Sequence, residues 1–191
     1  MEELINKIKS SITLSAEAEE HISSISKVKA ISKGELLISH GQMVKNTYFV
    51  TDGCLRSYGI DKNDKEHTLQ FAIKGWWISD FIAVYTNEPA TLNVEAIKDS
   101  YIIAFHTKDL DEIHSLFPEF EAFQRKNLER HVVSLHKRIL NQLQLTAHER
   151  YNVFLKQYPD IEQFTPNYHI ASYLGITQES LSRIRAEQSN K

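Results

Sequence analysis

The chain has 191 residues, of which 41% are apolar, and a formal net charge of −3. This length fits one large or two small domains, and without an eighteen-residue apolar run no transmembrane helix is expected. The start of the chain is amphipathic and acidic, unlike the basic-then-apolar order of a signal peptide. A single cysteine, Cys54, excludes an intramolecular disulfide and a four-cysteine cluster, so we expect a cytoplasmic protein with no membrane partner.

The net charge does not by itself indicate a nucleic-acid-binding protein, so the local distribution of charge matters more. The C-terminal third offers cations at Lys137, Arg138, Arg150, Lys156, Arg183, Arg185 and Lys191. Acids at Glu149, Asp160, Glu162 and Glu187 offset them. This balance predicts modest, salt-sensitive binding to nucleic acid rather than tight, sequence-independent binding.

Taken in chain order, residues 2–26 show the loose apolar spacing of a helical region. From about 28 to 106 the sequence changes to short β-rich runs separated by turn residues such as Gly, Asn and Asp, with turns predicted at Asp52-Gly53 and Lys98-Asp99-Ser100 among others. The predicted strands are 28–31, 36–39, 47–50, 54–60, 67–73, 91–97 and 101–106. Many short strands at this spacing predict an antiparallel barrel or roll.

Helical patterns return after the strands, over 107–116, from Pro118 to about 143, and over 146–158. The last of these begins with a capping-box match, Thr146 with Glu149 three residues on. The middle helix, roughly 36 Å long, carries one apolar stripe. Its members are Phe120, Phe123, Asn127, Leu128, Val132, Leu135, Ile139 and Leu143. We expect part of this stripe to pair with a second subunit; the alternative is packing along its own domain throughout.

Two short helices joined by a tight turn are predicted over 165–185. Thr165 is expected to cap the first helix, with Pro166 at its first position. Gly175 supplies the positive φ of the turn, and Thr177 caps the second helix. The buried faces are expected to carry Ile170, Ala171, Leu174, Leu181 and Ile184. This is the layout of a helix-turn-helix, whose second helix can enter the DNA major groove.

Polar side chains project from the first two turns of the second helix. Gln178 can read adenine, Glu179 can accept from cytosine N4, and Arg183 can bind guanine O6 and N7. The full predicted DNA-binding set is Thr177, Gln178, Glu179, Ser182, Arg183 and Arg185. The alternative is a purely structural helical hairpin.

A roll, a long helix and a helix-turn-helix in this order resemble the Crp/Fnr family of bacterial transcription regulators. Residues 33–41 resemble the family's opening strands, and residues 48–58, from Tyr48 to Tyr58, resemble its characteristic hairpin. The resemblance implies an α+β fold: an antiparallel β-roll of the jelly-roll type over 1–117, a dimerisation helix over 118–144 and a helix-turn-helix domain over 145–191. It implies a homodimer that binds double-stranded DNA, with RNA polymerase as a further partner.

The nucleotide-binding segment departs from the family pattern. Cyclic-nucleotide-binding members have Gly-Glu-Leu at the start of a short helix and an Arg-Ser pair about ten residues later. Here these read Ser79-Asp80-Phe81 and Ala90-Thr91, so the arginine that grips the cyclic phosphate is missing. We therefore expect no response to cyclic AMP. The residues left at this place form a predicted degenerate effector pocket: Trp77, Ser79, Asp80, Phe81, Ala90 and Thr91.

A second departure concerns the C-terminal domain. Family members usually continue into a β-hairpin wing, and the sequence predicts a helix-turn-helix without a full wing. Gln178 replaces an arginine that reads guanine in relatives, whereas Glu179 and Arg183 match the family pattern. The resemblance thus implies a different base preference opposite residue 178, worth about 1–3 kcal/mol for one bidentate contact.

Other chemistry is less favoured by the sequence. Nine histidines include no His-x-His pattern of a cupin-type metalloenzyme, and His131 and His136 are five residues apart, so no enzyme, metal or cofactor is expected. Trp76 and Trp77, with Phe71, Phe81 and Tyr85, either line an apolar effector pocket or fill the roll. Cys54 is either a redox sensor or a small buried apolar residue. The alternative to a DNA-binding regulator is a ligand- or protein-binding roll whose C-terminal helices serve only dimer packing.

Overall fold

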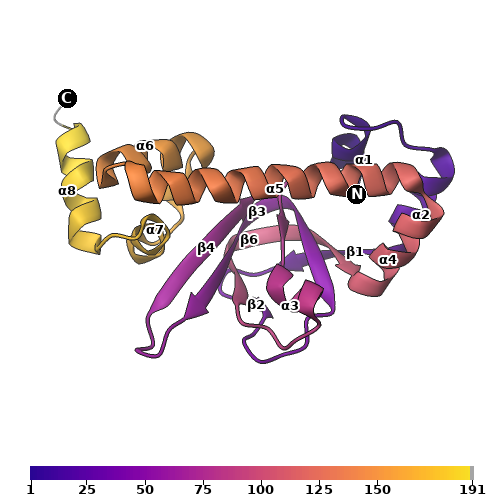
Figure 1. Cartoon of the computed structure of the whole chain (residues 1–191), viewed down its shortest axis with the longest axis horizontal. Coiled ribbons are helices and arrows are strands. Elements are labelled where there is room, and N and C mark those ends of the chain that lie inside the picture. Colours follow the sequence, from indigo (N-terminus) through magenta and orange to yellow (C-terminus); the bar gives the residue numbers. More distant parts are fainter. Residues whose placement is uncertain (190–191) are drawn as a thin grey trace.

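The computed structural model describes residues 1–189 and consists of a β-roll beneath one long helix (Figure 1). The N-terminal helices and α4 lie at one end of the long helix, and the C-terminal helices lie at the other. The helices are α1 (Glu2–Lys9), α2 (Ala16–Ile25), α3 (Phe81–Thr86), α4 (Thr107–Leu116), α5 (Pro118–Gln144), α6 (Ala147–Gln157), the 3₁₀ turn η1 (Ile161–Gln163), α7 (Asn167–Leu174) and α8 (Gln178–Ser189). None of the described helices combines the length and apolar character that a membrane span requires.

The N-terminal helical region is two helices rather than one. The chain leaves α1 at Ser10 and starts again at Ser15, whose hydroxyl accepts a hydrogen bond from the backbone N–H of Ala18 at 3.2 Å. Serine and threonine between the helices favour such caps over helix interior. Leu4, Ile8 and Ile22 are fully buried, which anchors both helices on the molecule.

The sheet contains six antiparallel strands. These are β1 (Ser26–Ile31), β2 (Leu36–Ile38), β3 (Asn46–Ile60), β4 (Glu66–Ile73), β5 (Trp77–Ile78) and β6 (Asn93–His106). The order is β1-β6-β3-β4, while β2 also pairs with β6 and β5 with β3. The two long strands β3 and β6 therefore form the spine of the roll.

Each spine strand was predicted as two strands with a turn between them, and this prediction was wrong. Asp52-Gly53 and Lys98-Asp99-Ser100 are not turns: they face each other across β3 and β6, where the pairing register shifts. The Ser100 hydroxyl accepts a hydrogen bond from the Cys54 N–H at 3.0 Å. Gly53 has φ +97°, and a Cβ there would lie 2.1 Å from the Ser100 Oγ. The turn-forming residues instead make a bulge at which both strands bend.

The expected helices after the roll are confirmed, including the length of α5 and the capping box of α6. Thr146 accepts from the Glu149 N–H at 3.3 Å, and the Glu149 carboxylate accepts from the Thr146 N–H at 2.8 Å. The observed architecture thus confirms the expected α+β fold with a jelly-roll β-domain. The predicted lack of a wing lies partly outside the described residues and stays a prediction.

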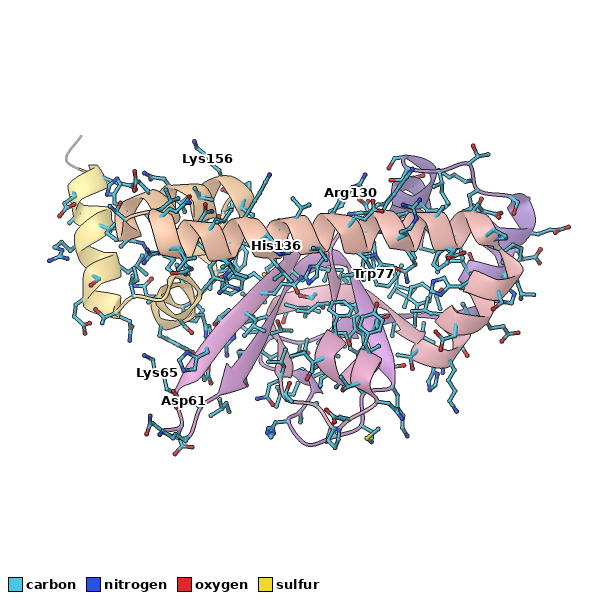
Figure 2. All side chains as sticks on the ribbon, in the orientation of Figure 1. Asp61, Lys65, Trp77, Arg130, His136 and Lys156 are labelled. Atoms are coloured by element: carbon cyan, nitrogen blue, oxygen red, sulfur yellow. The ribbon has the colours of Figure 1, made fainter. Side chains whose placement is uncertain are left out.

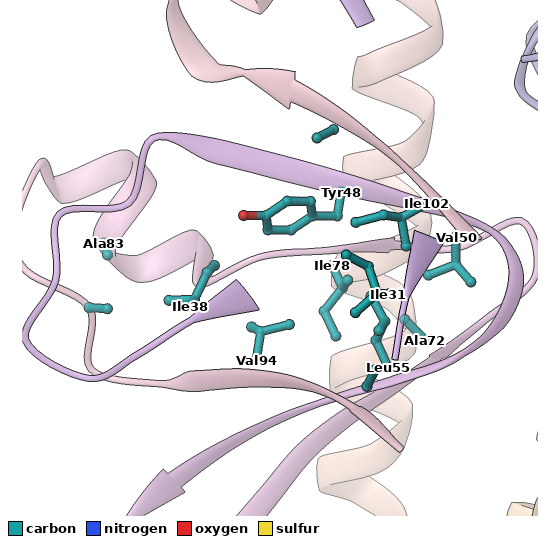
Figure 3. Close-up of a cluster of buried hydrophobic side chains, with 13 residues drawn as sticks. Ile31, Ile38, Tyr48, Val50, Leu55, Ala72, Ile78, Ala83, Val94 and Ile102 are labelled. Carbon is teal, nitrogen blue, oxygen red and sulfur yellow. The ribbon is translucent and has the colours of Figure 1, made fainter. Parts of the chain in front are cut away.

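Buried side chains gather in three clusters. One fills the roll, where Ile38, Val50, Leu55 and Ile102 meet (Figure 3). A second lies between the roll and the N-terminal helices. The third joins Phe71 of β4 to the C-terminal helices. Helices α7 and α8 therefore share a buried core with the roll and are not connected to it by a flexible linker alone.

Candidate nucleic-acid interface and effector cavity

The turn between α7 and α8 is made by Gly175 and Thr177. Gly175 adopts φ +66° and ψ +38°, and the Ile176 N–H closes on the Ala171 carbonyl at 3.0 Å. The Thr177 hydroxyl accepts from the Ser180 N–H at 3.2 Å and so caps α8. Both predicted roles are confirmed by this geometry.

The start of α7 differs from the prediction. Pro166 is extended (φ −56°, ψ +143°) and precedes the helix, which begins at Asn167. The Thr165 hydroxyl is buried without a hydrogen-bond partner among the described residues, so Thr165 does not cap α7. The prediction that Thr165 caps and that Pro166 is the first helical residue was wrong. The extended Pro166 leaves its carbonyl to accept from the N–H groups of His169 and Ile170, which starts the helix.

The inner faces of the two helices are as predicted. Ile170, Ala171, Leu174, Leu181 and Ile184 are all at most 5% exposed. They pack with Phe154 and Tyr158 in the cluster shared with the roll. The opposite face of α8 is therefore held at a fixed orientation.

The structure places Thr177, Gln178, Glu179, Ser182 and Arg183 at the surface, on or just before α8. In the described part of the chain, no hydrogen bond or ion pair joins the side chains of Gln178, Ser182 or Arg183 to another residue. Helix α8 stands at the outer end of the molecule, away from the roll (Figure 1). Its exposed face is accessible to a partner.

Arg185, also predicted to contact DNA, points back into its own domain. Its guanidinium forms an ion pair with Glu162 and hydrogen-bonds Asn167, and its Nε donates to the Tyr151 hydroxyl at 3.2 Å. Spacing along a helix cannot reveal such contacts, because Glu162 lies in the separate turn η1. We therefore treat Arg185 as a residue that holds α8 in place.

Helix α7 docks directly on strand β4 of the roll. The Ser172 hydroxyl donates to the Glu66 carbonyl at 2.8 Å and accepts from the Thr68 N–H at 2.9 Å. From α5, the Arg138 guanidinium donates to the Tyr173 carbonyl at 3.1 Å and to the Thr68 carbonyl at 3.0 Å. These polar contacts, which the sequence did not reveal, tie together the roll, the long helix and the helix-turn-helix.

His169 is the titratable group at this junction. It is 5% exposed, and burial followed by the nearby Arg56 charge lowers its pKa to about 3. Glu66 and Glu95 lie 3.8 Å from its two ring nitrogens, but both carboxylates are ion-paired with Arg56. The imidazole is therefore neutral at neutral pH.

The stability of the protein should consequently fall as the pH drops below about 6.5, because the unfolded state then binds a proton at His169 that the folded state rejects. Above that pH both states are neutral and the contribution is constant. The loss continues toward the folded-state pKa and amounts to at most about 1.4 kcal/mol per pH unit. We expect His169→Gln to flatten this part of a urea-unfolding profile between pH 7 and pH 4. His136→Gln, at an exposed position of α5, is the control, and equal slopes in all three proteins would contradict the assignment.

Asp80 occupies the center of the predicted degenerate pocket. Its fully buried carboxylate accepts from the N–H groups of Ile82 and Ala83 at 3.1 and 3.2 Å, which caps α3. It also accepts from the Thr91 N–H at 2.7 Å, the Thr91 hydroxyl at 3.2 Å and the Leu92 N–H at 2.8 Å. The carboxylate thus takes up the donors of α3 and of the 90–92 segment, and it repels a second anion.

The space beside this segment is also filled. Ala90 is part of the buried cluster inside the roll, together with Ala83 and Val94, which Figure 3 labels. The Ser79 hydroxyl is committed to the Asn46 carbonyl at 3.0 Å. The six predicted pocket residues are therefore not brought together in one open site: Ser79, Asp80 and Ala90 are buried, and Thr91 is exposed beside them.

Trp77 and Phe81, the other two predicted pocket residues, instead line a cavity of about 640 Å³ outside the roll. The cavity lies between α3, α4 and α5, and Figure 2 shows Trp77 beneath α5. Trp76 and Tyr85 line it as well, while Trp76 also packs against the buried cluster inside the roll, so the two interpretations of these aromatics do not exclude each other. Phe71 does not belong there: it packs against Phe154, Tyr158 and Tyr173.

Neither of the other chemical candidates gains support. Within residues 1–189, no three His, Cys, Asp or Glu side chains are grouped as metal ligands. Cys54 is fully buried, and burial raises the pKa of its thiol to about 12, which leaves almost no thiolate. The interpretation of Cys54 as a small buried apolar residue is the one that fits.

The apolar stripe of α5 divides into two parts. Phe120 and Phe123 are fully buried against the N-terminal helices. Further along, Leu128, Val132, Leu135 and Ile139 are each about half exposed. Their spacing of four, three and four residues is that of a coiled-coil seam.

Comparison with known proteins shows what the chain is similar to. Residues 28–115, which include most of the roll, match the family model of the cyclic nucleotide-binding domain. Electron transport regulator A of Shewanella oneidensis is 23% identical over 171 residues, which cover 84% of this chain and 68% of that protein.

Two solved structures share nearly the whole fold. FixK2 of Bradyrhizobium japonicum matches with a TM-score of 0.75 and 18% identity, over 87% of this chain and 85% of that one. A transcriptional regulator of the Crp/Fnr family from Eubacterium rectale matches with a TM-score of 0.72 and 17% identity, over 93% and 85%. At these identities the likeness concerns the fold alone, and the expected resemblance to Crp/Fnr regulators is confirmed at that level.

Proposed function

We propose that the protein is a sequence-specific DNA-binding transcription regulator of the Crp/Fnr type. The observation that carries the proposal is the outer face of α8, where Gln178, Glu179, Ser182 and Arg183 are exposed on a helix whose other face is packed. These side chains present amide, carboxylate, hydroxyl and guanidinium groups, which match base edges in the major groove. This function requires access to DNA, so the proposal includes a location in the cytoplasm. RNA polymerase stays a predicted partner.

The proposal includes a homodimer joined through the α5 seam. Two α8 helices related by a two-fold axis would enter successive major grooves about 34–36 Å apart and favour an inverted repeat. The dimer is supported by the four exposed seam residues, Leu128, Val132, Leu135 and Ile139, for which a second copy of the same helix is the matching surface. The proposal also includes the predicted division into a roll domain over 1–117, a dimerisation helix over 118–144 and a helix-turn-helix domain over 145–191.

Arg183→Ala is the variant that separates this proposal from a roll with purely structural C-terminal helices. Loss of one bidentate guanine contact costs about 1–3 kcal/mol, so we expect specific affinity to fall by roughly 5- to 150-fold. Lys156→Ala, which removes an exposed cation from α6, is the control and should change affinity much less. Fluorescence anisotropy with a labelled operator measures both. Unchanged binding by Arg183→Ala would favour the structural alternative.

The proposal also holds that cyclic AMP is not the effector. Asp80 already occupies the backbone donors at α3 and 90–92, and its charge opposes a phosphate. We expect no heat of binding when cyclic AMP is titrated into the protein in a calorimeter. Saturable binding at micromolar concentration would refute this part of the proposal.

A further inference from the structure

The cavity between α3, α4 and α5 is large enough for a small molecule. Its volume of about 640 Å³ is within the range of about 300–1,000 Å³ typical of ligand sites. It lies outside the filled interior of the roll and does not include Asp80 or Thr91. A ligand here would leave the hydrogen bonds of Asp80 to α3 and to residues 91 and 92 intact.

Aromatic and aliphatic side chains form much of the wall. Trp77 contacts Phe49 and Phe105 edge-on or tilted at its back, which fixes the indole. Phe81 stacks on Tyr85 from the same helix, and the ring centroids of Phe81 and of His131 on α5 are 5.7 Å apart. These rings offer flat apolar surface to a ligand body.

Three lining residues carry a buried polar atom without a hydrogen-bond partner among the described residues. These atoms are the Trp77 Nε1, the His114 Nε2 and the Thr47 Oγ1. An indole N–H only donates, a hydroxyl can donate, and a neutral imidazole nitrogen can donate in one tautomer. These three atoms are covered by protein, so the exposed side chains of the wall, and not these atoms, decide which ligand the cavity favours.

The charged side chains of the cavity wall favour an anionic ligand. Lys7, Lys108 and Arg130 line the cavity, and Asp111 is the only carboxylate among the described lining residues. In residues 1–188 no ion pair neutralises any of the three cations. Burial and the nearby Arg130 lower the pKa of Lys7, which Glu3 partly offsets, and the Lys7 ammonium donates to the Gly75 carbonyl. A bound anion would relieve the repulsion that remains between Lys7 and Arg130.

We propose that this cavity binds an organic carboxylate with an apolar body, the body against Trp77 and Phe81 and the carboxylate toward Lys7 and Arg130. Leu128, His131 and Ser134 place the seam helix α5 in the wall, so occupancy bears directly on the helix that joins the proposed dimer. This site goes beyond the proposed DNA-binding function and does not depend on it.

A fluorescence titration tests the site directly, because Trp76 and Trp77 are the two tryptophans of the chain and both line the cavity. The probe is 4-phenylbutanoate, compared with 4-phenylbutylamine, which has a matching body and the opposite charge. We expect saturable quenching by the acid at submillimolar to millimolar concentration and much weaker quenching by the amine. Cyclic AMP should not compete.

Two substitutions locate the charge. Arg130→Gln, at an exposed position, should weaken binding of the acid about fivefold, and Lys7→Met about tenfold. Their controls are Arg125→Gln on the same helix, whose guanidinium pairs with Glu129, and Lys9→Met on α1, whose ammonium pairs with Glu19. If Lys7→Met fails to fold, Arg130→Gln decides alone.

Equal quenching by acid and amine, no quenching at millimolar acid, or unchanged affinity in Arg130→Gln would each overturn the proposal. The titration contains no DNA. If the protein binds the acid but no DNA, the proposed site holds and the proposed DNA-binding function fails. If it binds DNA but not the acid, the proposed function holds and the proposed site fails.

Discussion

Replacing Leu135 by aspartate is expected to turn the proposed dimer into a folded monomer and to weaken binding to an inverted-repeat site by about 100-fold. Leu135 is 43% exposed in the single chain, in the middle of the seam with Leu128, Val132 and Ile139. A dimer would bury two like-charged carboxylates face to face there, and their desolvation and mutual repulsion would oppose association. Each half-site binds one α8 helix. In a dimer, binding of the first helix raises the effective concentration of the second at its half-site, and a monomer loses this gain in affinity.

Sedimentation velocity measures the dimer, and anisotropy with an operator measures the DNA affinity. The control is Val133→Asp, because Val133 is 52% exposed on the same helix but lies off the seam. It should leave mass and affinity nearly unchanged. If Val133→Asp dissociates the protein and Leu135→Asp does not, the dimer uses a different face of α5 and the proposed seam is wrong.

Asp80→Ala should lower the free energy of unfolding by at least about 3 kcal/mol, because it leaves buried and half-buried donors of α3 and of residues 91 and 92 without their acceptor. The carboxylate accepts five hydrogen bonds and is fully buried. Asp80→Asn keeps the shape but turns one acceptor oxygen into an NH₂ group, so its effect should be intermediate. Urea unfolding followed by circular dichroism gives all three values.

The control for Asp80 is Asp52→Ala, which removes an exposed carboxylate from the same roll and should change stability by no more than about 0.5 kcal/mol. A loss below about 1 kcal/mol in Asp80→Ala would mean that water or a rearranged loop can satisfy these donors. The segment would then be open enough to bind an anion, which would also undermine the expected lack of a response to cyclic AMP.

The sequence predicted best where one local signal decides the structure. Gly175 requires a left-handed backbone, Thr146 and Glu149 form a reciprocal cap, and the stripe from Phe120 to Leu143 requires one long helix. These features depend on residues within a few positions of each other. Local propensity and periodicity therefore sufficed to predict them.

Prediction failed where distant segments decide the structure. Gly53 and Ser100 read as turn residues, yet they meet across two strands and produce a bend. Arg185 has the spacing of a DNA contact, but Glu162 and Tyr151 hold it inside the domain. The docking of Ser172 on β4 likewise has no sequence signal, because it joins residues 104 and 106 positions apart.

The candidate pocket was half predictable for the same reason. The missing arginine before Thr91 was visible in the sequence, and so was the cluster of Trp77 and Phe81. The sequence did not show that Asp80 takes up the donors of residues 91 and 92. It also did not show that Trp77 and Phe81 line a separate cavity, because that cavity depends on how α4 and α5 pack. Periodicity does not encode where two helices leave a gap.

Selection of bound fragments from random DNA is the most direct test of the central claim that paired α8 helices read base edges. The account predicts enrichment of an inverted repeat with half-site centers about 10–10.5 base pairs apart. It further predicts that Gln178→Ala relaxes the preference at one symmetric pair of positions while the remaining positions are kept. No enrichment over random sequence, or a motif without two-fold symmetry, would contradict it.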